Sequence, residues 1–188
     1  LKDYNIKAEL TVTNRTGYHK YTFPESASSR ILIDMKHGIR DSCTGAMVKI
    51  VNDREIEGYR MSIGFVKKQT VYFCAQFSKP FKSFGTWKGN DINHGSSEES
   101  GYGIGAFVNY NTKENESVES KVGISYTSID QARLNLQAES SGWQFDKIRN
   151  QAEKIWNDEL GRIKVEFTAG INDEYRKDKM ITFYTALY

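Results

Sequence analysis

Alternating apolar and polar residues fill the first two thirds of the chain and predict β-strands. In NIKAELTVT every second side chain from Ile6 to Val12 is apolar, which predicts a half-buried strand that turns at NRTG and returns as YHKYTF. RILID is a short apolar run, and MVKIV and EIEGYRMSIGF flank the polar NDR as a predicted hairpin. TVYFCAQF places its apolar side chains on one face, and GIGAFVNY and SVESKVGISYTS are expected to pair across NTKENE. Such closely spaced strands with short polar turns favour a mainly β fold, an antiparallel β-sandwich, over a βαβ arrangement.

The periodicity becomes helical at Ser128. SIDQARLNLQAE opens with Ser128 and Gln131, the spacing of a capping box in which each side chain bonds the other residue's backbone N–H. WQFDKIRNQAEKIWNDELG repeats apolar residues at helical spacing, and Gly161 is expected as a left-handed residue at its end. RIKVEF predicts one more short strand.

The last segment, NDEYRKDKMITFYTALY, predicts a helix capped by Asn172 or Asp173. Met180, Phe183, Tyr184 and Leu187 form an apolar stripe on it, and no stop signal follows Leu187. Either this helix frays at its end or it belongs to something larger. The chain is therefore divided into a β-sandwich body at 1–127, a helical linker at 128–161, and a short strand and helix at 162–188.

Composition restricts the class of protein. A chain of 188 residues fits one domain or one domain plus the edge of a second, and 38% hydrophobic with 27% charged residues indicates a globular protein. The net charge of +2 is spread along the chain without a basic stripe, so we expect no nucleic acid partner. No stretch approaches the ~18 apolar residues of a membrane helix, so we expect no membrane span. Leu1 is not an initiator residue, and no signal peptide is visible.

Motifs that carry chemistry are scarce. The sequence has no Walker A loop, GxSxG elbow, HExxH or EF-hand pattern, and no pair of carboxylates stands out for glycoside hydrolysis. DREIE is better interpreted as a turn and hairpin than as a catalytic couple. His19 is placed in a strand and His37 and His94 in loops, with no metal-like spacing. Cys43 and Cys74 are interpreted as free thiols, with a disulfide left open. No catalytic residue and no metal ligand is assigned.

One long segment, SFGTWKGNDINHGSSEESGYG at 83–103, is the candidate binding site. It is predicted to be a loop, and long loops in compact domains are either functional or disordered. An aromatic ring beside short polar groups is typical of a sugar site, because the ring stacks on the apolar face of a pyranose. The candidate substrate-binding residues are Trp87, Asp91, Asn93 and His94. The competing interpretation is a mobile surface loop rich in Gly and Ser.

Several stretches together resemble the N-terminal domain of the family 92 glycoside hydrolases. They are AELTVTNRTGYHKYTFP, EIEGYR, VYFCAQFSKPF, VGISYTSIDQARLNLQAE, WNDELGRIKVE and FYTALY. The resemblance spans nearly all of residues 6–188 in the order of the family. It implies a galactose-mutarotase-like supersandwich, a helical linker and a large (α/α)6 catalytic barrel, with FYTALY in the first helix of that barrel.

The resemblance also implies a function. Members are exo-acting α-mannosidases, common in bacteria, that are secreted or periplasmic and act on mannose-containing glycans with inversion. A general acid, a base-activated water and Ca²⁺ act in the reaction, and these groups lie mainly in the barrel, which is absent here. No catalytic residue is therefore transferred to this chain, whose expected partner is the barrel of the same polypeptide. The alternatives left open are a free-standing carbohydrate-binding module and a purely structural domain.

Overall fold

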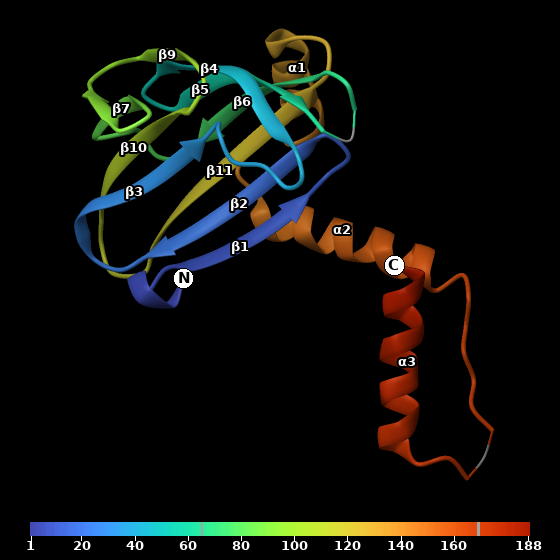
Figure 1. Cartoon of the computed structure of the whole chain (residues 1–188). Helices are drawn as coiled ribbons and strands as arrows, with labels where there is room; N and C mark the ends of the chain where they lie inside the picture. Colours follow the sequence, from blue (N-terminus) through green and yellow to red (C-terminus); the bar gives the residue numbers. More distant parts are fainter. Residues whose placement is uncertain (65, 169) are drawn as a thin grey trace. The chain divides into compact units, whose positions relative to one another are not determined.

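The computed structural model describes residues 1–64, 66–168 and 170–188. The chain forms two compact units, Leu1–Ile148 and Arg149–Tyr188. The first unit is an antiparallel β-sandwich with a helix on one face (Figure 1), which confirms the predicted mainly β fold class. Phe65, the last residue of the predicted EIEGYRMSIGF strand, lies outside the described residues.

A seven-stranded sheet has the order β1-β2-β11-β6-β5-β4-β9. Its strands are β1 (Lys7–Val12), β2 (Thr16–Phe23), β11 (Glu116–Ser125), β6 (Gln69–Phe77), β5 (Glu55–Ile63), β4 (Ser42–Asn52) and β9 (Glu98–Gly101). A 3₁₀ turn, η1 (Lys2–Tyr4), precedes β1. The β1–β2 and β4–β5 hairpins confirm two turns predicted from NRTG and NDR, since both pairs are antiparallel.

A four-stranded sheet with the order β3-β10-β7-β8 forms the second layer. Its strands are β3 (Ser26–Asp34), β10 (Ile104–Thr112), β7 (Ser83–Lys88) and β8 (Asp91–His94). The core lies between the two sheets and includes Phe73 and Phe77 of β6 with Val108 and Tyr110 of β10. The predicted apolar face of TVYFCAQF is therefore confirmed.

The expected pairing of GIGAFVNY with SVESKVGISYTS is wrong. β10 pairs with β3 and β7 in the small sheet, whereas β11 pairs with β2 and β6 in the large one. The NTKENE turn thus carries the chain from one layer to the other. Both strands are long and mostly buried. Each pairs on both sides with strands of its own layer, so no edge is left for the strand that is next to it in sequence.

The expected burial of the first strand is also wrong. Leu10 and Val12 are 65% and 58% exposed, whereas Thr11 between them is buried. β1 is the edge of the large sheet, and within the described residues no layer covers the side on which Leu10 and Val12 lie. An alternating pattern reports which side chains share a face, but not whether a second layer reaches that face.

The segment at 83–103 is not a loop. It contains β7, β8 and β9, with β7 and β8 forming a tight hairpin in the small sheet and β9 crossing to pair with β4 of the large sheet. Glycine, asparagine and serine conceal these strands because such residues are depleted in sheets. In this fold some of these residues lie in the short strands β8 and β9, which are edge strands of their sheets.

Helix α1 (Ile129–Glu139) covers the outer face of the large sheet. A Cβ at Gly123 of β11 would collide with the α1 backbone and with Leu136, so a glycine is required for this close approach. Ser128 is the N-cap, and its Oγ accepts from the Gln131 backbone N–H at 3.0 Å. Only this half of the predicted capping box forms, because the Gln131 side chain donates to Asn135 Oδ1 instead.

Helix α2 (Phe145–Leu160) begins in the first unit and ends in the second. In the first unit, the Phe145 ring packs against Tyr18 of β2 with centroids 5.6 Å apart. Gly161 follows the last helical residue as predicted, but its φ is not positive, so the expected left-handed cap is wrong. Its N–H continues the helical pattern by donating to the Asn157 carbonyl oxygen at 2.9 Å.

The rest of the second unit is an extended segment and one helix. RIKVEF is not a strand, because the residues that the structure describes there have no strand partner and an isolated strand lacks stabilising ladder bonds. Helix α3 (Asp173–Leu187) is capped by Asn172, as predicted, whose Oδ1 accepts from the Glu174 N–H at 2.7 Å. Within this unit Tyr184 donates to the Ile163 carbonyl oxygen, and the Trp156 ring packs at a tilt against Tyr188, with centroids 4.6 Å apart.

Candidate functional site

The structure divides the four predicted sugar-binding residues between the two faces of the small sheet. Trp87 pairs with Ile92 and Gly85 with His94, so Trp87 and His94 lie on the outer face. Asp91 and Asn93 alternate with these residues along β8, so they lie on the opposite face. The predicted set therefore does not form one site, although all four residues belong to a single hairpin.

Contacts of these residues support the division. The Trp87 ring lies against Gly105 of β10, where any Cβ would overlap the indole. His94 meets the Phe107 ring edge-on, with centroids 5.5 Å apart. Asn93 donates to Glu99 of β9 at 3.4 Å. Trp87 lines the cavity formed with Asp34, His37 and Tyr102, and the other three predicted residues do not line that cavity.

That cavity, called the aromatic cavity here, has a volume of about 250 Å³. Its principal lining side chains are Asp34, Lys36, His37, Trp87, Asn90 and Tyr102. They come from the end of β3 and the residues after it, the β7–β8 hairpin and the connection from β9 to β10. The cavity thus gathers two aromatic rings and several hydrogen-bonding groups from three separate parts of the sequence.

The β3 side of the aromatic cavity is a fixed turn. Asp34 Oδ1 accepts from the backbone N–H groups of Lys36 and His37 at 2.8 and 3.2 Å. Asp34 Oδ2 lies 2.5 Å from His37 Nδ1. Burial acts to raise the pKa of Asp34, but these hydrogen bonds and the charge of His37 outweigh it and hold that pKa below its usual range. With Nδ1 engaged, Nε2 of His37 is the ring nitrogen left for another partner.

The opposite side of the aromatic cavity is held by two glycines. Gly89 donates its N–H to the Gly103 carbonyl oxygen at 2.9 Å, which joins the β7–β8 turn to the segment before β10. Both have positive φ, 60° and 69°, a conformation that favours glycine. This bond fixes the backbone beside Asn90 and beside Tyr102, whose side chain is 60% exposed. Lys36 Nζ lies 5.9 Å from the centre of the Tyr102 ring.

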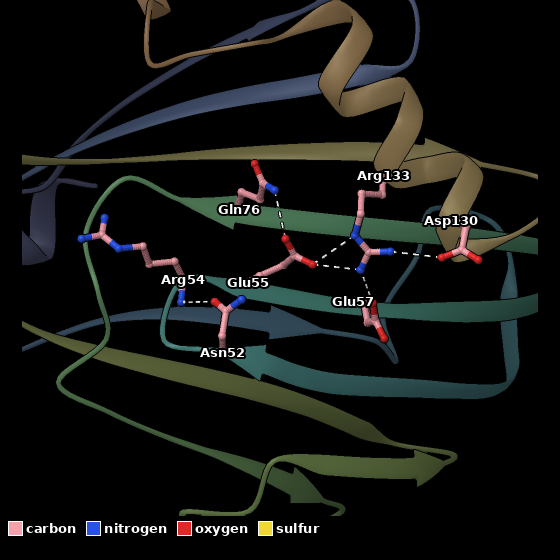
Figure 2. A network of polar contacts seen from close by, with 7 residues as sticks. All are labelled: Asn52, Arg54, Glu55, Glu57, Gln76, Asp130 and Arg133. Carbon is pink, nitrogen blue, oxygen red and sulfur yellow. Dashed lines mark hydrogen bonds and ion pairs between the residues drawn. The ribbon is translucent and has the colours of Figure 1, made fainter.

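The carboxylates of DREIE are part of the structural framework, as the sequence suggested. Figure 2 shows Glu55 and Glu57 of β5 converging on Arg133 of α1. Arg133 donates to Glu55 Oε1 from two nitrogens, at 2.8 and 3.2 Å, and also bonds Glu57. Gln76 of β6 donates to the other Glu55 oxygen at 2.9 Å. Both carboxylates are engaged in attaching α1 to the sheet, so neither is placed for acid–base chemistry.

The titratable groups of the described residues form no recognisable metal site. Among residues 1–64, 66–168 and 170–188, no three His, Cys, Asp or Glu side chains gather in a group that could hold a metal ion. Cys43 and Cys74 are buried free thiols, and burial raises the pKa of Cys74 to about 12. His19 lies in β2, as predicted, and burial lowers its pKa. His94 lies in β8 rather than in a loop.

Of the residues lining the aromatic cavity, sequence reasoning named Trp87 and missed Asp34 and His37. Asn90 and Tyr102 lie within the predicted segment 83–103 but were not among its four candidate residues. Asp34 and His37 lie about fifty residues before Trp87 in the chain, and only the pairing of β3 with β10 brings them together. One local signal was available, since an Asp side chain often accepts from the backbone N–H two residues later, as Asp34 does from Lys36. No helix in the described part of the chain is long and apolar enough to cross a bilayer.

Comparison with known proteins identifies two consecutive family domains. Residues 1–125 match the glycosyl hydrolase family 92 N-terminal domain, and residues 131–188 match the glycosyl hydrolase family 92 catalytic domain. An uncharacterized secreted glycosidase of Arthroderma benhamiae is 26% identical over 97% of this chain and 26% of its own length.

Solved structures agree with this assignment. A family 92 α-mannosidase from Bacteroides thetaiotaomicron is 33% identical, with a TM-score of 0.83 over 89% of this chain and 24% of its own. A family 92 inverting mannosidase from the same species is 22% identical, covers 86% of this chain and 21% of its own, and shares the fold with a TM-score of 0.75. The chain thus spans about a quarter of the length of these relatives. The chain belongs to glycoside hydrolase family 92, and its residues 1–125 and 131–188 match the N-terminal and catalytic domains of that family.

Proposed function

We propose that the chain is the non-catalytic N-terminal part of an exo-α-mannosidase that acts on mannose-containing glycans. The observation that carries this proposal is the unbroken order of the two family matches, the N-terminal domain up to residue 125 and the catalytic domain from residue 131. The 33% identity to an α-mannosidase supports the choice of substrate. The sandwich packs against the catalytic barrel of the same polypeptide and contributes to one wall of its cleft.

The chemistry of the intact enzyme is proposed to proceed with inversion. A general acid protonates the leaving oxygen while a base activates a water molecule on the opposite face of the sugar. Both groups are assigned to the barrel, as the resemblance to the family implies, and Glu55 and Glu57 of this chain are held by Arg133. A Ca²⁺ requirement is proposed for the intact enzyme as well. Its ligands are assigned to the barrel, as the resemblance to the family implies.

The site of action is proposed to be extracellular or periplasmic. The relative from Arthroderma benhamiae is named a secreted glycosidase, which supports this location. The same location is expected for an enzyme that degrades external glycans. The alternative of a free-standing binding module predicts that the gene stops at Tyr188. An open reading frame that continues for several hundred codons would support the mannosidase and speak against that module.

Product stereochemistry tests the proposal on the protein encoded by the complete gene. Hydrolysis of an α-linked mannobiose is followed by ¹H NMR of the anomeric protons during the first minutes. We expect β-mannose to appear first and to mutarotate later. Initial α-mannose would contradict inversion, and the absence of any mannose with α-1,2, α-1,3 and α-1,6 substrates would contradict the mannosidase assignment. Dialysis against a chelator should abolish the rate, and added Ca²⁺ should restore it.

A further inference from the structure

The aromatic cavity has the features of a site for one sugar ring. Its volume of about 250 Å³ lies below the range of about 300–1,000 Å³ typical of sites for drug-sized ligands, so it suits a small ligand. Trp87 is packed on Gly105 on one side, so only the other side of the indole is available to a ligand. Tyr102, with 60% of its surface exposed, adds a second ring at the rim.

The polar groups of the cavity complement these rings. Asn90 supplies an amide with both donor and acceptor atoms, and His37 supplies Nε2, since its Nδ1 is engaged by Asp34. The Tyr102 hydroxyl and the Lys36 ammonium add further donors at the rim. Alternating hydroxyls and C–H faces of a pyranose require this combination of aromatic surface and mixed donors and acceptors.

The charge of the lining favours a neutral ligand. Asp34 lies in the same wall as Lys36 and is bonded to His37, so its negative charge is balanced locally. The lining residues do not form the cluster of positive charges that a phosphate or a carboxylate ligand would need. The backbone that carries the rim groups is fixed by the Gly89–Gly103 bond and the turn at Asp34, which reduces the entropy lost on binding.

We propose that the aromatic cavity binds one neutral pyranose unit of a glycan, with Trp87 and Tyr102 as the stacking surfaces and Asn90 and His37 as the hydrogen-bonding groups. This site is assigned to the sandwich itself and does not depend on the barrel. Only the choice of mannose as the first probe rests on the proposed function.

Binding is tested by NMR on the 188-residue chain. Amide and indole N–H signals are followed while α-1,2-mannobiose is added, and in a parallel titration cellobiose is added. We expect saturable shifts with a dissociation constant of about millimolar order, centred on the Trp87 indole, the Asn90 side-chain amide, Gly89 and Gly103. Binding of either disaccharide at these signals supports the pyranose site. Binding of cellobiose without mannobiose would support the site and count against mannose recognition, whereas the hydrolysis assay tests the proposed function separately.

Variants decide whether the cavity is responsible. Tyr102→Ala and Asn90→Ala remove exposed or turn side chains, and each should weaken binding about 3- to 10-fold. Trp87→Ala should abolish it, provided that its amide spectrum shows an intact sandwich. Tyr4→Ala is the matched control, because Tyr4 is 70% exposed in η1 and does not line the cavity, and its affinity should be unchanged. The proposal would be overturned if neither sugar gave saturable shifts. It would also be overturned if Tyr102→Ala and Asn90→Ala both bound with the affinity of the wild-type chain.

Discussion

Replacement of Arg133 by methionine should loosen α1 from the sheet. Arg133 bonds Glu55 and Glu57 across the outer face of β5 and bonds Asp130 within its own helix at 3.2 Å. The side chains of Arg133, Glu55 and Glu57 are only 26%, 13% and 17% exposed. Methionine preserves most of the apolar stem but leaves two neighbouring carboxylates without their cation.

The loss of unfolding free energy expected for R133M lies between two known limits. Breaking a buried ion pair costs about 3–5 kcal/mol, whereas an exposed pair is worth about 0–1 kcal/mol. Because all three groups retain some solvent contact, we expect a loss of about 2–3 kcal/mol in the free energy of unfolding. For a protein of this size, that loss lowers Tm by about 5–10 °C. The triple variant R133M/E55Q/E57Q should recover part of the loss, since no uncompensated charge remains.

Cys74 provides a local assay for the same event. It lies on β6 with 0% exposure, and Arg133 is close enough to affect its pKa. In a Cys43→Ser background, the rate at which a thiol reagent modifies Cys74 should rise about 30- to 150-fold in R133M if the whole loss of about 2–3 kcal/mol appears as local opening of α1. Lys7→Met is the control, because Lys7 is 69% exposed in its pair with Glu9. A Tm within 1 °C of wild type, with Cys74 still fully protected, would refute this reasoning.

Three further changes test other parts of the fold. Gly105→Ala should cost about 1–3 kcal/mol and shift the tryptophan fluorescence, because the added methyl group overlaps the Trp87 ring. Ser128→Ala should cost about 1 kcal/mol in urea unfolding, since it removes the N-cap of α1. Glu116→Gln should flatten the acid limb of the stability profile. Lys79 donates to Glu116 at 2.5 Å and holds the pKa of Glu116 below its ordinary value of 4.5. The stability from this pair is therefore present above that ordinary value and is lost as the pH falls through the lowered pKa.

Each of these predictions has a result that contradicts it. An unchanged fluorescence maximum in Gly105→Ala would show that Trp87 does not rest on Gly105. Equal urea midpoints for Ser128→Ala and wild type would remove the capping argument. If Glu116→Gln loses stability on acidification as steeply as wild type between about pH 5 and 3, other carboxylates dominate that limb.

Local features of the fold could be predicted from the sequence. The β1–β2 and β4–β5 hairpins follow from turn residues between alternating segments, and the caps at Ser128 and Asn172 follow from their side chains. These features depend on residues close in sequence. The layer to which a strand belongs does not, and for that reason the assignment of β10 and β11 to one hairpin failed.

The candidate site was predicted only in part for the same reason. Trp87 was predicted because an aromatic ring beside short polar residues is typical of a sugar site. Its neighbours along the hairpin were chosen by proximity in sequence, yet strand alternation turns Asp91 and Asn93 to the other face. Asp34 and His37 reach the aromatic cavity only through the long-range pairing of β3 with β10, which no local pattern reports.

The most direct test of the central claim compares the protein encoded by the complete gene with residues 1–188 in one assay. Both are incubated with an α-linked mannobiose and Ca²⁺, and released mannose is measured by chromatography. The account predicts that the complete protein releases mannose and that residues 1–188 release none, because the catalytic groups are assigned to the barrel. Mannose release by residues 1–188, or none by the complete protein with any of the three linkages, would contradict it.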